Sequence, residues 1–510
     1  MSSVLLDALA GVLSPVSILL VLVGTAGGII VGALPGLTAT MAIALLVPFT
    51  FGMSPVHGLV LLGAIYTSAI YGGSFSAILI NTPGTPSAIA TTFDGYPMAR
   101  RGEAYRAIVT ATIASVVGGL IGVAFLIFLS PPLARASLRF GPPEYFWLAM
   151  FGLTIIAAVS PRSTLKGLIG GGIGLLISTV GISPIDGATR YNFGTLSLQS
   201  GISLIPALIG FFCIPEVLRM VEESQHSGEM IPYKRQRRMV KRVLQQLVRR
   251  PWLMIRSSVI GTLVGIIPGA GGNIAGLVSY NEAVRASRDK ASFGQGAVEG
   301  VAASEAANNA SVAGALIPML TLGVPGAPPA AVLFGALLLQ GMRPGAELFT
   351  TYAPVTYAFL FSLVLANLAM LPLGLLLGKG VARLMQKVKV QTMAPVIIFL
   401  SMVGSYSIYN NLGDVYTMVA TGIVAHVLRK AGFQPGPIVL GLILGPIAEQ
   451  GLLQSLLLGR ARGSMLMVFF ARPISVVLIV LTVVSILAPI LVQIRDRRAL
   501  RQGPSSGGTE

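Results

Sequence analysis

Two short motifs that combine proline with glycine recur in the same order in both halves of this sequence. The run Gly28-Ile-Ile-Val-Gly-Ala-Leu-Pro-Gly36 matches Gly261-Thr-Leu-Val-Gly-Ile-Ile-Pro-Gly269 without a gap. Further along, the run that begins at Asn81 (Asn-Thr-Pro-Gly-Thr-Pro-Ser-Ala) is matched by Gly-Val-Pro-Gly-Ala-Pro-Pro-Ala, which ends at residue 330. A single Gly-x-x-x-Gly is a common packing motif of membrane helices. Two ordered pairs of motifs instead indicate an internal repeat.

These motifs have a chemical consequence in apolar surroundings. Proline lacks a backbone donor and glycine tolerates left-handed conformations, so each motif predicts an interrupted helix. Inside a membrane, the freed N–H and C=O groups must be satisfied by protein or by water, so the breaks are expected to line an internal polar site. Paired breaks at corresponding positions are typical of a transporter's site near the bilayer midplane. The helix that follows a break presents N–H groups suited to a carboxylate, and free carbonyl oxygens can bind Na⁺.

Neutral polar side chains surround the four breaks. We predict that a substrate anion contacts residues from both halves, namely Thr38, Asn81, Thr82, Pro83, Gly84, Thr85, Asn308, Asn309, Pro325 and Gly326. The backbone carbonyls of Gly36, Gly269 and Gly323 are the candidate Na⁺ ligands. Further polar or small residues adjoin the same breaks, namely Ser87, Gly271, Gly272, Asn273, Ser304 and Ser311. For any single Thr or Asn, hydrogen bonding between helices is the alternative interpretation.

Carboxylates are scarce near the breaks. Glu305 lies beside the polar cluster of the second half, and it is the candidate group for binding a coupling cation or a proton. The alternative is a carboxylate at the edge of a span. Asp94 is followed by Gly95, which favours its interpretation as a turn residue. No Lys or Arg falls in the predicted site, so the number of substrate charges does not follow from the side chains.

The elements that position these residues are membrane helices. The chain has 510 residues, of which 54% are hydrophobic and 10% charged, whereas an average soluble protein has about 25% charged residues. No Asp, Glu, Lys or Arg occurs from residue 8 to residue 93. The sequence therefore predicts an all-α polytopic membrane protein with about 10–12 spans plus broken or re-entrant helix hairpins. Spans are expected near 10–34, 57–72, 107–129, 145–160, 164–182, 199–217, 257–267, 303–321, 348–378, 393–411, 414–428 and 474–494, and broken pieces at 37–52, 74–93, 270–284 and 327–342.

A basic insert separates the two halves. Its cations, of which Lys234 is the first and Arg250 the last, indicate a cytoplasmic loop rather than a nucleic-acid partner, although the net charge is +17. Apolar residues at 240, 243, 244, 247 and 248 have helical spacing, which predicts an amphipathic helix on the inner membrane surface. Residues 1–218 are the first repeat, 219–256 the insert, 257–494 the second repeat and 495–510 a disordered cytoplasmic tail. Because the N-terminus carries no Lys or Arg, it is free to lie outside, and the repeats are predicted to be inverted.

The combination of these motifs resembles the TctA family, the large permease of tripartite tricarboxylate transporters. The match is carried by residues 28–40 and 71–86, by Asp94-Gly-Tyr-Pro97, and in the second half by residues 265–271 and 323–326. The resemblance implies a secondary carrier for tri- or dicarboxylates in the bacterial inner membrane, driven by a cation, with Na⁺ favoured over H⁺. It also implies two partners, a small four-span membrane subunit and a periplasmic substrate-binding protein.

Other classes of function lack their motifs. A primary pump needs a nucleotide site, but no Gly-x-x-x-x-Gly-Lys-[Ser/Thr] occurs. An intramembrane enzyme is the second class, and neither His-Glu-x-x-His nor Gly-x-Ser-x-Gly is present. One cysteine and three scattered histidines do not suggest a metal site, and no cofactor beyond the coupling ion is expected. A passive anion channel remains open, because saturable, cation-dependent uptake is needed to exclude it.

Overall fold

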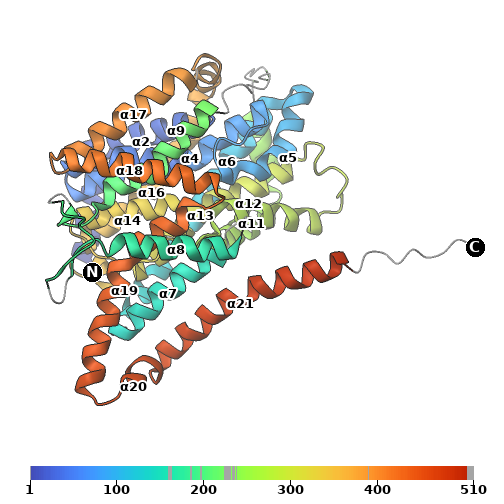
Figure 1. Cartoon of the computed structure of the whole chain (residues 1–510). Coiled ribbons are helices and arrows are strands. Elements are labelled where there is room, and N and C mark those ends of the chain that lie inside the picture. Colours follow the sequence, from blue (N-terminus) through green and yellow to red (C-terminus); the bar gives the residue numbers. More distant parts are fainter. Residues whose placement is uncertain are drawn as a thin grey trace, which may run out of the picture. The chain divides into compact units, whose positions relative to one another are not determined.

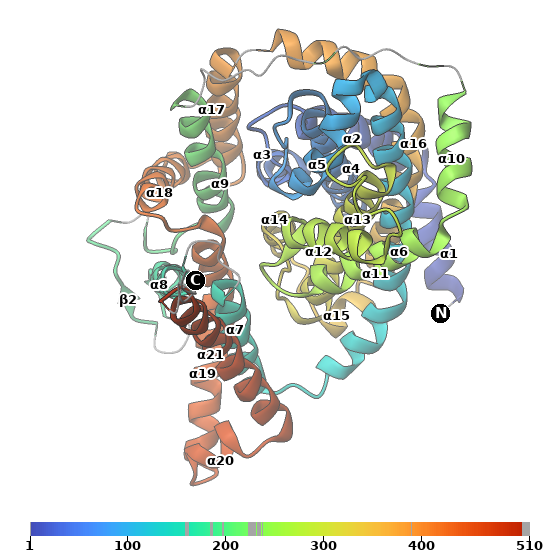
Figure 2. The same ribbon diagram turned by 90° about the vertical axis from the view of Figure 1, so that its right-hand side faces the viewer.

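The computed structural model describes residues 2–501 apart from 159–162, 184–186, 196–197, 223–230, 232–235, 237 and 389. Helices dominate the described residues (Figures 1 and 2). Six of the described helices are long and apolar enough to cross a membrane, and shorter apolar helices of 10–17 residues accompany them. The predicted class, an all-α polytopic membrane protein, is confirmed. The six are Pro15–Ala33, Pro55–Ile80, Pro86–Ser137, Leu204–Glu222, Ala353–Lys387 and Pro435–Ala461.

The chain forms two compact units, and each takes segments from both predicted repeats. The first unit comprises residues 1–139 and 203–427, and the second comprises 140–202 and 428–510. The elements of the first unit are α1 (Ser2–Val12), α2 (Pro15–Ala33), α3 (Ala39–Phe51), α4 (Pro55–Ile80), the 3-10 turn η1 (Pro86–Ala88), α5 (Ile89–Met98), the π-turn η2 (Ala99–Glu103), α6 (Ala104–Ser137), α9 (Leu204–Glu222), α10 (Met239–Val248), α11 (Pro251–Ile266), α12 (Gly271–Ala286), α13 (Val298–Leu322), α14 (Pro328–Leu339), α15 (Ala346–Phe349), α16 (Ala353–Lys387), α17 (Val390–Ser407) and α18 (Leu412–Lys430). The elements of the second unit are α7 (Pro142–Ala158), α8 (Thr164–Ser178), β1 (Gly181–Ile182), β2 (Thr189–Arg190), α19 (Pro435–Ala461), α20 (Met465–Phe470) and α21 (Pro473–Arg501).

All four predicted breaks interrupt helices in the structure. Glycines with positive φ angles occupy three of them, with φ +89° at Gly36, +82° at Gly269 and +73° at Gly323. At the remaining break, Asn81 adopts the left-handed conformation with φ 55° and ends α4. Gly and Asn are the residues that reach this region at low cost, which explains why the helices end here.

Three of the predicted boundaries differ from the structure. The predicted span 10–34 is divided into α1 and α2, because Ser14 caps α2 by accepting a hydrogen bond from the Ser17 N–H and Pro15 occupies the first helical position. The predicted broken piece 74–93 starts later, because α4 continues to Ile80 and the break is confined to residues 81–85. Near the C-terminus, α21 ends at Arg501, beyond the predicted start of the tail at residue 495, and residues 502–510 lie outside the described part.

The second break of each repeat is closed by the same backbone hydrogen bonds. The N–H of Gly84 donates to the carbonyl of Gly73 at 3.4 Å, and the N–H of Gly326 donates to that of Ala315 at 3.2 Å. The pairs 82 with 76 and 324 with 318 are joined in the same way, at 3.4 and 3.2 Å. Residues 73, 76, 82 and 84 thus correspond to 315, 318, 324 and 326 without insertion or deletion. The repeat in the sequence is accompanied by equivalent local structure.

The paired glycines before the first break of each repeat bring two helices into close contact. A Cβ atom on Gly28 of α2 would lie 2.7 Å from the carbonyl oxygen of Ile65 on α4. In the second half, a Cβ on Gly265 of α11 would lie 2.9 Å from the Cα of Ser311 on α13. Such contacts are closer than real Cβ atoms make, so only glycine fits. The motif holds α2 against α4, and α11 against α13, and so positions the breaks that follow.

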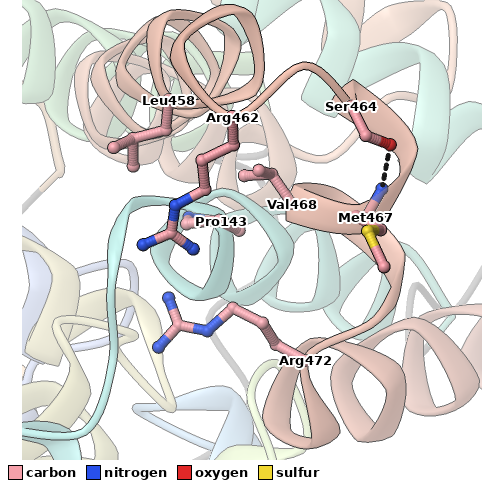
Figure 3. Close-up of a pocket in the computed structure, with 7 residues that line it drawn as sticks. All are labelled: Pro143, Leu458, Arg462, Ser464, Met467, Val468 and Arg472. Atoms are coloured by element: carbon pink, nitrogen blue, oxygen red, sulfur yellow. Dashed lines mark hydrogen bonds between the residues drawn. The ribbon is translucent and has the colours of Figure 1, made fainter.

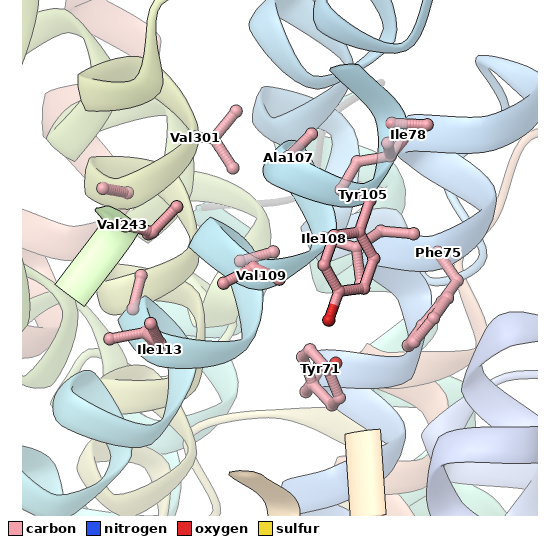
Figure 4. Packing of buried hydrophobic residues seen from close by; sticks show 14 of the residues in the cluster. Tyr71, Phe75, Ile78, Tyr105, Ala107, Ile108, Val109, Ile113, Val243 and Val301 are labelled. Atoms are coloured by element: carbon pink, nitrogen blue, oxygen red, sulfur yellow. The ribbon is translucent and has the colours of Figure 1, made fainter. Parts of the chain in front are cut away.

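The amphipathic helix of the insert docks on the main core of the first unit. Val243 of α10 is buried in one cluster with Tyr105 and Ile108 of α6 and with Tyr71 of α4 (Figure 4). On another edge of α10, Leu244 and Val248 are 47% and 67% exposed. The predicted amphipathic helix is therefore confirmed, and its remaining apolar edge is free to contact lipid. Lys234, Arg235 and Arg237 of the basic cluster lie outside the described residues.

The second unit has a polar centre of its own. Glu144 of α7 is fully buried, and its carboxylate accepts from Arg472 Nε at 3.0 Å, Ser475 Oγ at 2.9 Å and the Gly141 N–H at 2.8 Å. Arg472 also lines a pocket of about 150 Å³ with Arg462 and five other residues (Figure 3). The other five are Pro143, Leu458, Ser464, Met467 and Val468. The pocket contains no residue of the four breaks, so it is not part of the predicted site.

Candidate functional site

Polar side chains from both halves of the chain surround Gly272, in the first turn of α12. A Cβ atom on Gly272 would lie 2.6 Å from Asn308 Oδ1, 2.8 Å from Ser87 Cβ and 3.2 Å from Ser311 Oγ. Thr85 extends the group, since its Oγ1 lies 3.0 Å from Ser87 Oγ. We call these residues, Thr85, Ser87, Gly272, Asn308 and Ser311, the Asn308 cluster. It joins the second break of the first repeat to the helix that follows the first break of the second repeat.

The amide of Asn308 is the unusual group of this cluster. Asn308 is 0% exposed, and within the described residues neither its Nδ2 nor its Oδ1 has a hydrogen-bond partner. Buried amides in native proteins are nearly always paired, and an unpaired buried polar group costs about 1–3 kcal/mol. A side chain in this state is suited to a ligand that supplies the missing partner.

The backbone adds donors at the same point. Gly271 begins α12 with a φ of +47°, and the first N–H groups of a helix have no acceptor inside the helix. Helix N-termini favour anions, because their N–H groups and dipole both point toward negative charge. The Ser311 hydroxyl already donates to the backbone carbonyl of Asn308 at 2.7 Å. The Asn308 amide, the Ser87 hydroxyl and the start of α12 therefore form a neutral site of donors suited to a carboxylate.

Thr85 and Asn308 are the two predicted substrate contacts that the structure brings into this cluster. Asn309, the next residue, faces another helix, since its Nδ2 donates to the Thr67 carbonyl of α4 at 3.3 Å. Thr38 caps α3 by accepting from the Met41 N–H at 3.2 Å. Asn81 and Thr82 are exposed at the end of α4. Nothing in the described contacts joins these other residues to Asn308.

The predicted backbone ligands lie at separate breaks. Gly269 donates its N–H to the carbonyl of Gly326 at 2.9 Å, so the two breaks of the second repeat are in contact there. Gly84, in the second break of the first repeat, packs against Gly32. A Cβ on Gly36 would meet Met220 Cγ at 2.7 Å, whereas one on Gly323 would meet Phe334 Cε2 at 3.5 Å. Pro83 is partly buried and Pro325 is buried. No contact of the described residues unites the carbonyls of Gly36, Gly269 and Gly323.

Glu305 lies one turn before Asn308 on α13. It is 0% exposed, its Oε1 accepts from Thr91 Oγ1, and its Oε2 accepts from Ser115 Oγ at 2.9 Å. Three helices, α5, α6 and α13, therefore meet at this carboxyl group. Glu305 lies in the first half of α13 and is fully buried, so it is not an exposed carboxylate.

Asp94 links α5 to the start of α13, and its interpretation as a turn residue was wrong. Asp94 lies inside α5 and is 0% exposed. Its Oδ1 accepts from the N–H groups of Gly296 and Ala297, both at 2.7 Å, and its Oδ2 accepts from the Tyr280 hydroxyl at 2.9 Å. A carboxylate here caps α13 from another helix and complements its dipole. No local pattern around Asp94 indicates this role, because the capped helix begins about 200 residues later.

Ser87 of η1 and Thr91 and Asp94 of α5 form one line of polar residues. They are spaced at i, i+4 and i+7, which places them in line along a helix. Each contacts α12, α13 or the turn before α13. The far end of this line adjoins a polar pocket of about 480 Å³, which Gly296 and Ala297 help to line. The remaining lining residues are Arg101, Glu103, Arg106, Gln246, Asp289, Ser292, Val298 and Glu299.

Apolar spans and paired helix breaks are typical of a polytopic membrane transporter, and the buried Asn308 amide beside the start of α12 has no partner among the described residues. Residues 18–440 match the model of the family described as the tripartite tricarboxylate transporter TctA family, and the chain belongs to this family. The resemblance found in the sequence is thus confirmed.

Two relatives from Agrobacterium vitis support this assignment. One, described as an uncharacterized 52.8 kDa protein in the TAR-I ttuC' 3'region, is 36% identical over 493 residues, which are 95% of each chain. The other, an uncharacterized protein in the TAR-II ttuC' 3'region, is 36% identical over 239 residues, which are 47% of this chain and 97% of the relative. No solved structure matches the chain.

Proposed function

We propose that this chain is the large membrane subunit of a tripartite secondary carrier, which takes up a tri- or dicarboxylate across the bacterial inner membrane. A periplasmic binding protein delivers the anion, and a small four-span membrane subunit completes the carrier. A cation gradient, of Na⁺ or of H⁺, drives uptake. Membership of the TctA family supports this proposal, because the family is that of tripartite tricarboxylate transporters.

One observation carries the assignment of the binding site. The buried Asn308 amide has no partner within the described residues, and it lies beside the N-terminal turn of α12. A substrate carboxylate accepts from Asn308 Nδ2, from the Ser87 hydroxyl and from the first N–H groups of α12. The remaining predicted contacts, among them Asn81, Thr82 and Asn309, join the substrate as the carrier changes conformation.

The contacts of the basic insert support an inverted arrangement of the repeats. At the end of α4, the carbonyl of Leu79 accepts from the N–H of Ile231 in the insert at 3.1 Å. At the start of α13, Glu299 pairs with Arg250 of the insert at 2.6 Å. α4 and α13 carry equivalent breaks at their C-terminal ends, yet they meet the insert at opposite ends. Opposed repeats of this kind suit alternating access to a central site.

If Na⁺ is the coupling ion, backbone carbonyls are its candidate ligands. The helices that end near Gly36, Gly269 and Gly323 leave carbonyl oxygens without partners inside the helix, and oxygens of this kind bind Na⁺ in carriers with broken helices. The three breaks would have to approach one another in another state of the cycle for one ion to touch all of them. Two alternatives, a passive anion channel and an intramembrane enzyme, are outcomes of the test below.

Uptake of labelled citrate and succinate tests the proposal. Cells expressing the chain with its two partner subunits are expected to show saturable uptake that requires a cation gradient and the binding protein. Asn308→Ala removes donors to a charged group, which are worth about 1.5–3 kcal/mol, so half-saturation should rise about 10- to 100-fold. The control Asn273→Ala alters an exposed asparagine beside Gly272 on α12 and should leave uptake unchanged. Non-saturable flux without a gradient would indicate a channel, and unchanged uptake by Asn308→Ala would remove Asn308 from the site.

A further inference from the structure

The carboxyl group of Glu305 ends a continuous chain of hydrogen bonds. Thr91 Oγ1 contacts Glu305 Oε1 and also lies 3.4 Å from Ser304 Oγ. Ser304 in turn donates to the carbonyl of Gly300 at 2.8 Å. Gly300 adjoins Asp94, because a Cβ on Gly300 would overlap the Asp94 carboxylate. The hydrogen-bonded chain therefore runs from Glu305, next to the Asn308 cluster, to the carbonyl of Gly300, and Gly300 packs against Asp94 beside the polar pocket at the start of α13.

No cation balances Glu305 within the described residues. The charged groups of the helices around it have other partners, with Asp94 bound to the start of α13 and to Tyr280, and Arg256 of α11 placed 3.4 Å from Glu282 of α12. On α6, Arg106 pairs with Glu103 at 3.0 Å, and on α4 the Tyr71 hydroxyl lies 2.6 Å from Thr112 Oγ1. A lone carboxylate inside a membrane protein is costly, so the group requires a proton or an ion.

The hydrogen bonds around Glu305 accommodate the group with and without a proton. Without a proton, Thr91 donates to Oε1 and Ser115 donates to Oε2. With a proton on Oε1, Glu305 donates to Thr91, Thr91 donates to Ser304, and Ser304 donates to Gly300. Every hydroxyl hydrogen therefore has an acceptor in both states, which suits a group that binds and releases a proton.

We propose that Glu305 is the group that carries a coupling proton. Thr91, Ser304 and Asp94 mark the route of this proton to the polar pocket at the start of α13. Glu305 binds a proton from the side on which the substrate enters. It releases the proton to water on the other side after the substrate has left, so that one proton crosses in each cycle. This inference rests on the proposed function and assigns its coupling ion to a side chain of the same site.

Two transport modes of the complete carrier separate coupling from binding. Membrane vesicles are prepared in Na⁺-free buffer, and labelled citrate is the probe, with succinate as the second. A pH gradient, acid outside, should drive wild-type accumulation of the probe against its concentration gradient. Glu305→Gln, which imitates the protonated form, should lose at least about nine-tenths of this accumulation while it keeps exchange of internal for external probe. Glu282→Gln, which alters a partly exposed carboxylate on α12, should keep both modes.

The outcomes are distinguishable. Exchange with undiminished pH-driven accumulation by Glu305→Gln would overturn the inference and leave the proposed function standing. Wild-type accumulation that ignores the pH gradient and follows only Na⁺ would also overturn it. Absence of both modes in the wild type, for both probes, would overturn the proposed function itself. If Glu305→Gln proves unstable, Glu305→Asp keeps a proton-binding group and must retain pH-driven accumulation for the inference to hold.

Discussion

The glycine contacts that precede each break give a sharp prediction for stability. Gly27 and Gly28 are neighbours on α2, but their surroundings differ. A Cβ atom on Gly28 would lie 2.7 Å from the Ile65 carbonyl and 3.0 Å from the Ala69 nitrogen, and would overlap Ser68 Oγ. A Cβ on Gly27 would meet nothing within 4 Å. The same substitution, Gly→Ala, therefore has opposite consequences at adjacent positions of one helix.

The expected size follows from two opposing effects. Replacing glycine by alanine inside a helix stabilises it by about 0.8–1 kcal/mol, and this gain applies at both positions. At Gly28 the added methyl also forces α2 away from α4, and overpacking of this kind costs about 1–3 kcal/mol, more where backbone must move. We expect Gly27→Ala to be neutral or stabilising by up to about 1 kcal/mol. Gly28→Ala should be less stable than Gly27→Ala by about 1–3 kcal/mol.

Thermal unfolding of the purified carrier in detergent, followed by loss of the monodisperse species, measures this difference. Gly28→Ala should melt several degrees below Gly27→Ala, and the equivalent variant Gly261→Ala on α11 should melt below wild type as well. Equal melting temperatures for Gly27→Ala and Gly28→Ala would refute the close approach of α2 and α4 and, with it, the way in which the first break is held.

Two further predictions concern buried carboxylates. Asp94→Asn weakens charge-assisted hydrogen bonds to the start of α13 and should destabilise the protein by about 1.5–3 kcal/mol in thermal unfolding. The control Asp289→Asn, in an exposed loop, should have little effect. Equal stability of the two variants would contradict the capping role of Asp94. Glu144→Gln in the second unit removes the charge that faces Arg472 and should lower the free energy of unfolding by about 1–3 kcal/mol in the same assay. Unchanged stability would show that this ion pair does not stabilise the protein.

The sequence predicted the breaks because their cause is local. Pro35-Gly36 and its equivalent at 268–269 end helices through backbone conformation, which the residue types alone determine. The repeat also showed which breaks correspond. The helix boundary at Ser14-Pro15 was not predicted, because it lies within continuous apolar sequence and depends on the capping role of Ser14.

The composition of the site was predicted only in part, because it depends on distant pairing. Asn308 and Thr85 were both named from the sequence, but their joining through Ser87 and Gly272 depends on how helices pack. Asn308 and Asn309 read alike in the sequence, yet adjacent residues on a helix face different neighbours. Asp94 was misread because its partners lie about 200 residues away.

Substrate protection of one residue tests the central claim most directly. The only native cysteine, Cys213, is buried, so a cysteine placed at Ser87 in η1 reports on the Asn308 cluster. Thr92→Cys, at a partly exposed position of α5 outside this cluster, is the control. With the complete carrier active in exchange, saturating citrate should slow the reaction of the Ser87→Cys thiol with a small methanethiosulfonate reagent several-fold, and should leave Thr92→Cys unaffected. If the carrier exchanges citrate but the Ser87→Cys thiol reacts equally fast with and without citrate, the placement of the substrate at the broken helices is contradicted.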